Sequence, residues 1–172
     1  HTAYRRQRQM CIRDSLGGSY NQSLYSTYLP IYMERKGINS AFAIDIAGEH
    51  TGLDYDVTVT IHKIAQSLSD NIVLQVALTE SNISYSWQGQ SELNFVERLM
   101  IPDCNGTILD FSTDSTNIVN LSFTLDEEWI AYNCELVALI QDDDSQEILQ
   151  GSKLSLIDLP VDDVPFSGLE SV

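Results

Sequence analysis

The residues best suited to catalysis and metal binding are sparse in this sequence. Beyond residue 15 it holds two histidines, His50 and His62, and neither lies in a metal-ligand spacing. The sequence contains neither the Gly-x-Ser-x-Gly nucleophile motif nor the His-Glu-x-x-His zinc motif. A carboxylate pair for glycoside hydrolysis has many candidates among the acidic residues, but no pattern marks one. We therefore predict no catalytic residue, no cofactor and no metal site, and we expect that the protein is not an enzyme.

Two cysteines, Cys104 and Cys134, offer a second kind of chemistry. They lie 30 residues apart, one in a predicted turn and the other near the start of a predicted strand. Without a Cys-x-x-Cys motif, a dithiol redox role is not expected. Outside the cytoplasm the two thiols could form a disulfide worth about 3 kcal/mol by loop entropy. Two separate, half-buried thiols are the alternative, which the sequence favours slightly.

Three other side chains are candidates for facing a ligand. Trp87 and Trp129, together with several tyrosines, could form a stacking platform for a sugar, although aromatic residues in β-sandwiches more often pack in the core. Arg98 is expected near the middle of a strand with acidic neighbours. Its guanidinium either holds an ion pair that fixes the sheet or faces a ligand. The ion pair is the favoured interpretation, so we expect Arg98→Ala to lower stability rather than to abolish binding.

The acidic run at residues 142–144 offers hard oxygen ligands of the kind that calcium prefers. It lacks the glycine and the spaced acidic positions of an EF-hand loop. An ordinary solvated hairpin turn is therefore the favoured interpretation, and calcium binding near Asp142 and Asp144 is the alternative.

The charge of the chain excludes one class of partner. The sequence has 25 acidic residues against nine basic ones, a formal net charge of −16. Four of the nine basic residues fall in residues 1–15, where the segment MCIRDS resembles a translated sequencing adaptor of a metagenomic fragment; a genuine basic arm is the alternative. Without this segment the net charge is about −19. Such a surface repels phosphate, so nucleic acid is excluded as a partner.

Two kinds of element must position these residues. Residues 21–36 carry apolar side chains at spacings of three and four, which predicts a helix that ends at Gly37. Pro30 lies inside this segment and predicts a kink or a break into two short helices, because proline lacks an N–H and clashes with the preceding turn. One apolar face of the helix therefore needs a partner.

From residue 40 onward the hydrophobic period changes to two, and β-branched residues dominate. The Asn105-Gly106 pair predicts a tight hairpin, and the polar run at 142–145 predicts another turn. Eight strands without intervening helices indicate an all-β fold, an antiparallel Ig-like or jelly-roll β-sandwich of about eight strands with a short N-terminal helical segment. The strands are expected near residues 40–47, 54–65, 71–80, 92–101, 106–112, 117–125, 133–141 and 146–157.

Four parts are expected along the chain. The tail loses hydrophobic periodicity and contains proline, glycine and acidic residues. We expect residues 1–15 to be artefactual or disordered, 16–38 to form a helical connector, 39–158 to form the sandwich, and 159–172 to be a linker to a missing C-terminal segment.

Several strand sequences resemble one known family. They are residues 94–102 (NFVERLMIP) followed by Asn105-Gly106-Thr107, residues 76–80 (VALTE), residues 133–142 (NCELVALIQD) and residues 147–150 (EILQ). Over about residues 38–158 the chain is similar to the β-sandwich domain of the twenty-eight-kilodalton outer-membrane protein family of Bacteroidota. The similarity rests on strand patterns rather than on invariant chemistry.

The resemblance implies an architecture and a location. In that family a thioredoxin-like domain precedes the sandwich, and a sorting segment for type IX secretion often follows it. The helical connector would then come from the missing thioredoxin-like domain, which is the expected partner within the same chain. The resemblance also implies an outer-membrane surface or secreted location, and it carries over no catalytic residue. The segment Asp114-Ser115-Thr116 matches the acceptor pattern of Bacteroidota O-glycosylation, which makes Ser115 a candidate glycan site.

The expected function is a non-enzymatic interaction module for adhesion or display, with a protein or a glycan as its ligand. A carbohydrate-binding module is one alternative, which an exposed cluster of Trp87, Trp129 and tyrosines would favour. An accessory domain of a secreted enzyme is the other. A cluster of carboxylates with shifted pKa values in a deep cleft would favour it.

Overall fold

The computed structural model describes residues 25–67, 71–87 and 89–162, and the chain divides into two compact units between Asn39 and Ser40. The described part of the first unit contains α2 (Tyr25–Lys36), and Gly37 ends it by donating its N–H to the carbonyl oxygen of Glu34 at 3.1 Å. No helix within the described ranges is long and apolar enough to cross a bilayer.

The helix α2 continues through Pro30, so the predicted break into two helices is wrong. Proline removes only its own N–H donor, and the carbonyl that would accept it belongs to Ser26, in the first turn of the described helix. The predicted residues 21–24 lie outside the described part. Exposed apolar side chains line the helix, namely Tyr25, Leu29, Ile31, Tyr32 and Met33.

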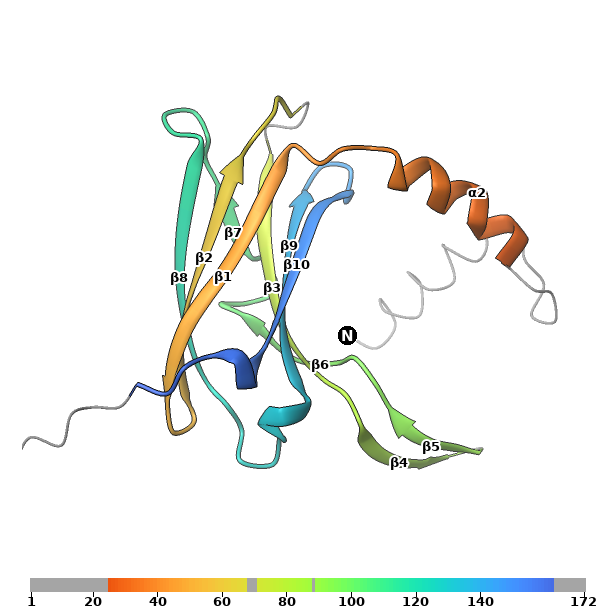
Figure 1. Cartoon of the computed structure of the whole chain (residues 1–172), viewed down its shortest axis with the longest axis vertical. Helices are drawn as coiled ribbons and strands as arrows, with labels where there is room; N and C mark the ends of the chain where they lie inside the picture. The colour runs from red at the N-terminus through yellow and green to blue at the C-terminus, as the bar shows by residue number, and fades with distance from the viewer. Residues whose placement is uncertain (1–24, 68–70, 88, 163–172) are drawn as a thin grey trace, which may run out of the picture. The chain divides into compact units, whose positions relative to one another are not determined.

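In the second unit, three antiparallel strands make the first sheet of a sandwich (Figure 1). They are β1 (Phe42–Thr51), β2 (Asp54–Lys63) and β8 (Thr116–Thr124), in the order β1-β2-β8. Gly52 lies in the turn between β1 and β2 with a φ of +62°, which glycine adopts without strain. The register of β2 with β8 runs without a shift from Asp54 opposite Thr124 to His62 opposite Thr116.

The second sheet has the order β10-β9-β3-β6, and β7 also pairs with β3. Its strands are β3 (Ile72–Glu80), β6 (Val96–Ile101), β7 (Thr107–Leu109), β9 (Cys134–Asp142) and β10 (Ile148–Ser155), all paired antiparallel. The polar turn predicted at residues 142–145 is confirmed, because it joins β9 to β10. Asp142 caps it by accepting the N–H of Gln146 at 2.8 Å on its carbonyl oxygen.

The Asn105-Gly106 pair does not form the predicted hairpin. The strands before and after it, β6 and β7, both pair with β3, along Val76 to Glu80 and along Ile72 to Leu74 respectively. A nine-residue β3 therefore holds two short strands end to end along one edge, and the turn interrupts that edge. Gly106 has a φ of +72°, and a Cβ there would lie 2.5 Å from the carbonyl oxygen of Leu74.

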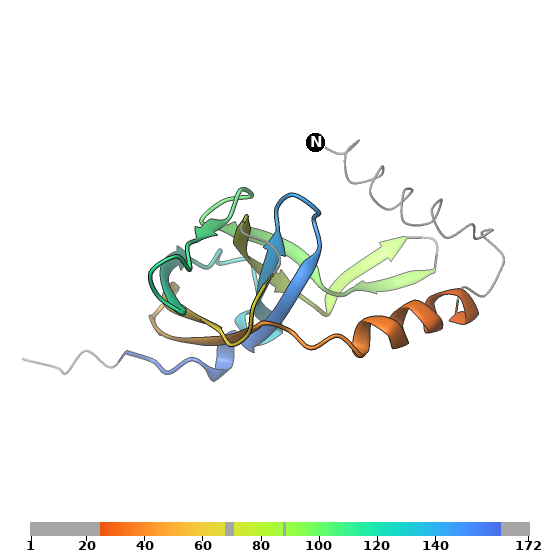
Figure 2. The same cartoon turned by 90° about the horizontal axis from the view of Figure 1, so that it is seen from above.

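A third sheet, which the sequence did not predict, lies between β3 and β6. It consists of β4 (Ile83–Trp87) and β5 (Gln90–Leu93), and in both cartoons this hairpin extends beyond the two main sheets (Figures 1 and 2). The described residues thus form ten strands in three antiparallel sheets. The single strand expected at 92–101 is divided at Phe95, whose φ is +55°.

The core lies between the two main sheets, which face each other in Figure 2. Along β2 the predicted alternation is confirmed, since Tyr55, Val57, Val59 and Ile61 are buried. The inward side chains of β3 and β9 supply most of the opposite wall. Among the described residues one charged side chain is buried, that of Glu80.

The chain after β10 packs on the sandwich instead of beginning a linker at residue 159. The short 3-10 helix η2 (Leu156–Asp158) is followed by Leu159, which is buried in the core. The backbone of His50 then accepts an N–H from Asp162 at 2.8 Å and donates its own N–H to the carbonyl oxygen of Pro160 at 3.1 Å. Residues 163–172 of the predicted linker lie outside the described part.

Candidate functional site

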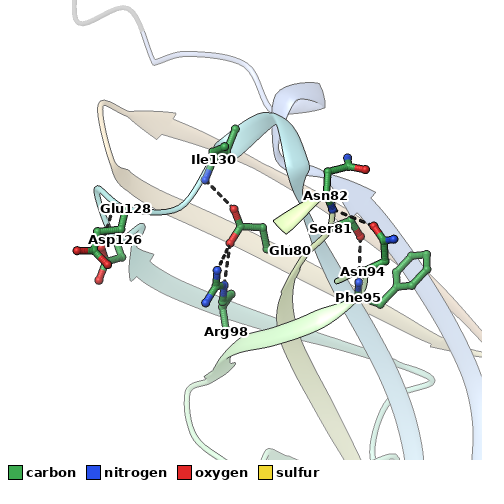
Figure 3. A network of polar contacts seen from close by, with 9 residues as sticks. All are labelled: Glu80, Ser81, Asn82, Asn94, Phe95, Arg98, Asp126, Glu128 and Ile130. Atoms are coloured by element: carbon green, nitrogen blue, oxygen red, sulfur yellow. Dashed lines mark hydrogen bonds and ion pairs between the residues drawn. The ribbon is translucent and has the colours of Figure 1, made fainter. Parts of the chain in front are cut away.

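Glu80 and Arg98 form an ion pair at the end of β3 (Figure 3). The Nε of Arg98 donates to Oε2 of Glu80 at 2.7 Å, and its Nη2 lies 2.6 Å from the same oxygen. Only 4% of the Glu80 side chain and 28% of the Arg98 side chain are exposed. The interaction that the sequence favoured for Arg98 is therefore present, with a partner on the neighbouring strand.

The other oxygen of Glu80 holds the loop that precedes β9. The N–H of Ile130 donates to Oε1 at 3.0 Å, so both carboxylate oxygens have donors (Figure 3). The guanidinium carbon of Arg98 lies 5.7 Å from the ring centroid of Trp129, a cation–π contact. Arg98 thus faces Glu80 and Trp129, and this cluster fixes the loop to two strands.

Of the two interpretations of the tryptophans, a stacking platform or core packing, the position of Trp129 fits the second. That side chain is only partly exposed, and it packs against the core beneath Arg98. The side chain of Trp87 lies outside the described ones, although its backbone ends β4.

Cys104 and Cys134 are separate free thiols, as the slightly favoured interpretation had it, and the disulfide considered beside it does not form. Cys134 is fully buried opposite Glu80 in the register, whereas Cys104 is exposed three residues before Thr107, which pairs with Leu74. Glu80 and Leu74 are six residues apart on β3, roughly 20 Å at the ordinary rise of a strand. A disulfide requires Cα atoms within about 7 Å of each other.

Burial keeps Cys134 protonated. The pKa of its thiol is raised from 9.0 to about 11, chiefly by burial and then by the charge of Glu80, while the charge of Arg98 acts in the opposite direction. The pKa of Tyr55 is also raised, first by burial and then by Cys134. Because the thiolate is the nucleophile and the metal ligand, Cys134 is a packing residue at neutral pH.

Phe95, next to the β4–β5 hairpin, has an unusual backbone. Its φ of +55° is in the left-handed region that bulky residues rarely adopt, and its side chain is largely exposed. The N–H of Phe95 donates to Oγ of Ser81 at 3.0 Å, and the N–H of Asn82 donates to Oδ1 of Asn94 at 2.9 Å (Figure 3). Asn82 Nδ2 also reaches Oδ1 of Asn133 at 3.2 Å. This junction holds a strained residue with its aromatic ring in solvent.

The hairpin itself borders a shallow hollow of about 510 Å³ lined by hydroxyl groups, glycine and one tyrosine. The lining residues are Ser84, Tyr85, Ser86, Gly89 and Ser91. Residues 81–91 contain no charged side chain, in a chain whose net charge is −16. An aromatic ring can stack on the apolar face of a ligand, and the hydroxyl groups around that ring can form hydrogen bonds with the edge of the ligand.

Glu80, Phe95 and the hairpin were not predicted from the sequence. A glutamate at the end of an alternating apolar strand, at an inward position, was the available signal for Glu80. Nothing in residues 92–101 marks Phe95 as left-handed, because that conformation is imposed by the bonds of Ser81 and Asn94 across the junction.

Comparisons with known proteins bear on the sandwich. No protein-family model matches the sequence, and no curated protein matches it significantly. One similar solved structure is a domain of the outer-membrane lipoprotein Omp28 from Porphyromonas gingivalis, with a TM-score of 0.54 and 16% identity over 72% of this chain and 93% of that one. This chain has the fold of the Omp28 domain. The fold expected from the resemblance is confirmed.

A second solved structure, HBP35 of Porphyromonas gingivalis, has a TM-score of 0.67 with 12% identity. The match covers 88% of this chain and 51% of HBP35, so the chain spans about half the length of that protein.

Within this Omp28-like sandwich His50 and His62 make packing contacts. The ring of His50 stacks on Tyr55 with centroids 4.8 Å apart, and its Nδ1 lies 3.1 Å from the carbonyl oxygen of Gly52. His62 Nδ1 lies 3.1 Å from Oγ1 of Thr116, and its Nε2 lies 3.8 Å from Asp45. They are on different strands with different partners, so the structure does not bring them together.

Ser115 lies on the exposed loop before β8. Its carbonyl oxygen accepts the N–H of Lys63 at 2.7 Å, while Asp114 Oδ1 accepts the N–H of Thr116 at 3.0 Å. A hollow of about 420 Å³ adjoins this loop. The site is accessible to a glycan-transferring enzyme; glycosylation stays a prediction, which the intact mass of protein from a Bacteroidota host would test.

The carboxylates at residues 142–144 serve the β9–β10 turn. Asp142 Oδ1 accepts the N–H of Asp144 at 3.0 Å, and its Oδ2 accepts the hydroxyl of Ser145 at 2.7 Å. Asp144 accepts an amide N–H of Asn71 at 3.1 Å. No group of three or more metal-ligating side chains occurs within the described ranges.

Proposed function

We propose that this chain is a non-enzymatic interaction domain displayed outside the cytoplasm of a Bacteroidota bacterium, with the β4–β5 hairpin as its recognition element. The observation that carries the proposal is the hairpin, which extends from the sandwich with Glu92 as its one charged residue, beside an exposed, strained Phe95. Strained backbone that the surrounding structure maintains is common at functional sites.

The composition of the hairpin supports a recognition role. Serine and glutamine recur in it beside one tyrosine, one tryptophan and one glycine, and binding loops likewise combine rigid aromatic contacts with adaptable hydrogen bonds. Glu92 is the one charged residue of the hairpin, so a partner meets little repulsion along residues 81–91.

The environments of the reactive and titratable side chains support a non-catalytic role. Cys134 is buried with a raised pKa, and Glu80 and Arg98 satisfy each other. Asp110 has a lowered pKa because Ser112 donates hydrogen bonds to it, and it lies in an exposed turn rather than a deep cleft. An accessory role in an enzyme, for which a cleft of such carboxylates would argue, is therefore not the proposal we favour.

The proposed location outside the cytoplasm is supported by the proteins that share this fold. One of them is a domain of an outer-membrane lipoprotein, and both come from Porphyromonas gingivalis. Export would place the hairpin where extracellular proteins and glycans are available as ligands.

A carbohydrate ligand is the second candidate, and the hollow on the hairpin favours it. Tyr85 is about half-exposed there among the hydroxyls of Ser84, Ser86 and Ser91. Stacking of a sugar ring on tyrosine with hydroxyl-to-hydroxyl bonds would suit this surface.

The test is to probe a glycan array and a peptide array with the full chain and two variants. The recognition variant combines Tyr85→Ser with Phe95→Gly. The control variant, Ile148→Ser, changes an exposed apolar residue on β10. We expect at least one class of ligand to bind the wild type and the control but not the recognition variant. Binding that survives in the recognition variant, or no binding on either array, would contradict the proposal.

A further inference from the structure

The strands at the edges of the two main sheets differ in how they are protected. An edge strand presents unpaired N–H and C=O groups, and proteins protect such edges with charged residues, proline, bulges, short strands or covering segments. The edges here are β1 and β8 of one sheet, and β10 and β6 with β7 of the other.

Three of these edges carry a protective feature. β10 has Lys153 and a register shift between Ile148 and Gln150. β6 contains the charged residues Glu97 and Arg98, and β7 is only three residues long.

β1 is covered at both ends by other segments of the chain. Gln150 Nε2 donates to the carbonyl oxygen of Phe42 at 2.9 Å, and the backbone of His50 bonds to Pro160 and Asp162. Its exposed positions also include Asp45 and Glu49.

β8 has none of these features. Its nine residues, TNIVNLSFT, include no charge and no proline, and its register with β2 is unbroken. Within the described part β8 pairs with β2 alone, and neither view shows a described strand beyond it (Figures 1 and 2). The side-chain amide of Asn117 donates to the carbonyl oxygen of Asp110 at 2.8 Å, so the neighbouring loop covers only the beginning of this edge.

We propose that β8 pairs with β8 of a second copy of this chain, antiparallel about a two-fold axis at Asn120. This register places Val119 opposite Leu121 of the second copy on the half-buried face of the sheet. On the outer face Asn120 meets its own symmetry mate, and Ile118 meets Ser122. No like charges lie opposite each other within the nine residues, which favours the pairing.

The charges of β2 do not oppose this arrangement. β2 has Asp54 and Asp56 at one end and His62 and Lys63 at the other. The two-fold axis places the acidic end of one β2 beside the basic end of the other, roughly 15 Å away across two β8 strands. The result is one continuous six-stranded sheet, a closed isologous dimer.

The first test is the mass of the full chain by size-exclusion chromatography with light scattering over a range of concentrations. We expect twice the 19.3 kDa of one chain at high concentration. Asn120→Lys should give the mass of one chain, because two lysines then face each other at the axis. Thr58→Lys is the matched control: it loses the same Thr58–Asn120 hydrogen bond of 3.0 Å and adds the same charge, but on central strand β2. It should remain dimeric.

A second test checks the register with Cys11 and Cys104 replaced by serine. Asn120→Cys should cross-link two chains on oxidation. Ser122→Cys should not, because its two copies would be four residues apart along the strands, roughly 13 Å.

A single chain at every concentration would overturn the proposal and leave the β8 edge to an extended segment of another protein. A dimer that survives Asn120→Lys, or that Thr58→Lys also abolishes, would place the contact away from this edge. Cross-linking through Ser122→Cys in preference to Asn120→Cys would contradict the register.

Discussion

At the scale of single residues, the chemistry of this chain is used to hold its structure together. The buried carboxylate of Glu80 joins Arg98 on β6 to the backbone of Ile130, so three segments depend on one side chain. Its burial is tolerated because both oxygens are paired, and an unpaired buried charge would cost several kcal/mol.

Loss of Arg98 should therefore destabilise the fold. Arg98→Ala leaves Glu80 buried without its cation and is expected to lower the free energy of unfolding by about 2–3 kcal/mol, below the roughly 3–5 kcal/mol of a fully buried pair because the Arg98 side chain is 28% exposed. Urea denaturation measures the change.

The matched double variant adds Glu80→Gln, which removes the orphaned charge but keeps an oxygen for the N–H of Ile130. It should recover about 1 kcal/mol or more of the loss. A double variant as unstable as the sum of the two single variants would show that the pair is not coupled.

The left-handed backbone of Phe95 should lower the stability of the fold. Its left-handed backbone costs an L-residue about 1–2 kcal/mol relative to glycine, part of which glycine loses again through its freedom in the unfolded chain. Phe95→Gly should thus be more stable than Phe95→Ala by about 0.5–1 kcal/mol, since both remove the ring and only glycine relieves the strain. Thermal and chemical denaturation of the two variants test this, and equal stabilities would count against strain at Phe95.

Cys134 should make the protein sensitive to alkali. Its pKa rises from 9.0 to about 11 in the folded chain, so the unfolded chain releases the thiol proton first. The corresponding stability is fully present below pH 9 and is lost as the pH rises to 11. Tyr55, whose pKa is raised above its ordinary value of 10.0, contributes in the same direction from about pH 10 upward.

Denaturant unfolding at pH 8, 9.5 and 10.5 would measure this loss. Cys134→Ala lacks the thiol, so its stability, although lower at pH 8 because a buried atom is removed, should fall less steeply over this range. Parallel pH profiles for the two proteins would rule out the thiol as the cause.

At the scale of elements, much of the sandwich could be predicted. The strands β2, β3 and β9 were located to within two residues at each end, because one buried face gives an alternating pattern that sequence displays directly. The Arg98 ion pair was also foreseen, since a rare arginine near the middle of a strand with acidic neighbours favours a paired charge.

What could not be predicted depends on contacts between distant segments. The division at Phe95 and the β4–β5 hairpin rest on bonds to Ser81, Asn94 and Asn133, which no local pattern encodes. The Asn105-Gly106 pair correctly marked a turn but not which strands it joins, because a turn signal does not specify the pairing of its flanks. Pro30 marked a kink or a break in the helix, but α2 continues through it without a break.

Two glycines in turns should respond differently to substitution. Gly106 and Gly52 both have positive φ, but a Cβ at Gly106 would meet Leu74 and Val73, whereas one at Gly52 meets nothing within 4 Å. Gly52→Ala should cost about 1 kcal/mol, from the backbone alone. Gly106→Ala should cost at least about 1 kcal/mol more, measured by urea denaturation. Equal costs would mean that the edge between β6 and β7 gives way without strain.

At the scale of the whole molecule, a strongly acidic chain carries two features with little charge: the β4–β5 hairpin, whose one charged residue is Glu92, and the β8 edge, which has none. They belong to different sheets, so one surface can bind a ligand while the other pairs two copies. Pairing through β8 would present two hairpins per assembly, and two linked sites can raise the apparent affinity for a repeated ligand without any new contact.

The central claim is that the hairpin is where ligands bind. Hydrogen–deuterium exchange of the full chain, with and without the strongest glycan or peptide from the arrays, tests it most directly. We predict slower exchange in residues 83–95 on binding, with β2 and β8 unchanged. Protection confined to the outer face of β2 and β8, with the hairpin unaffected, would contradict the account.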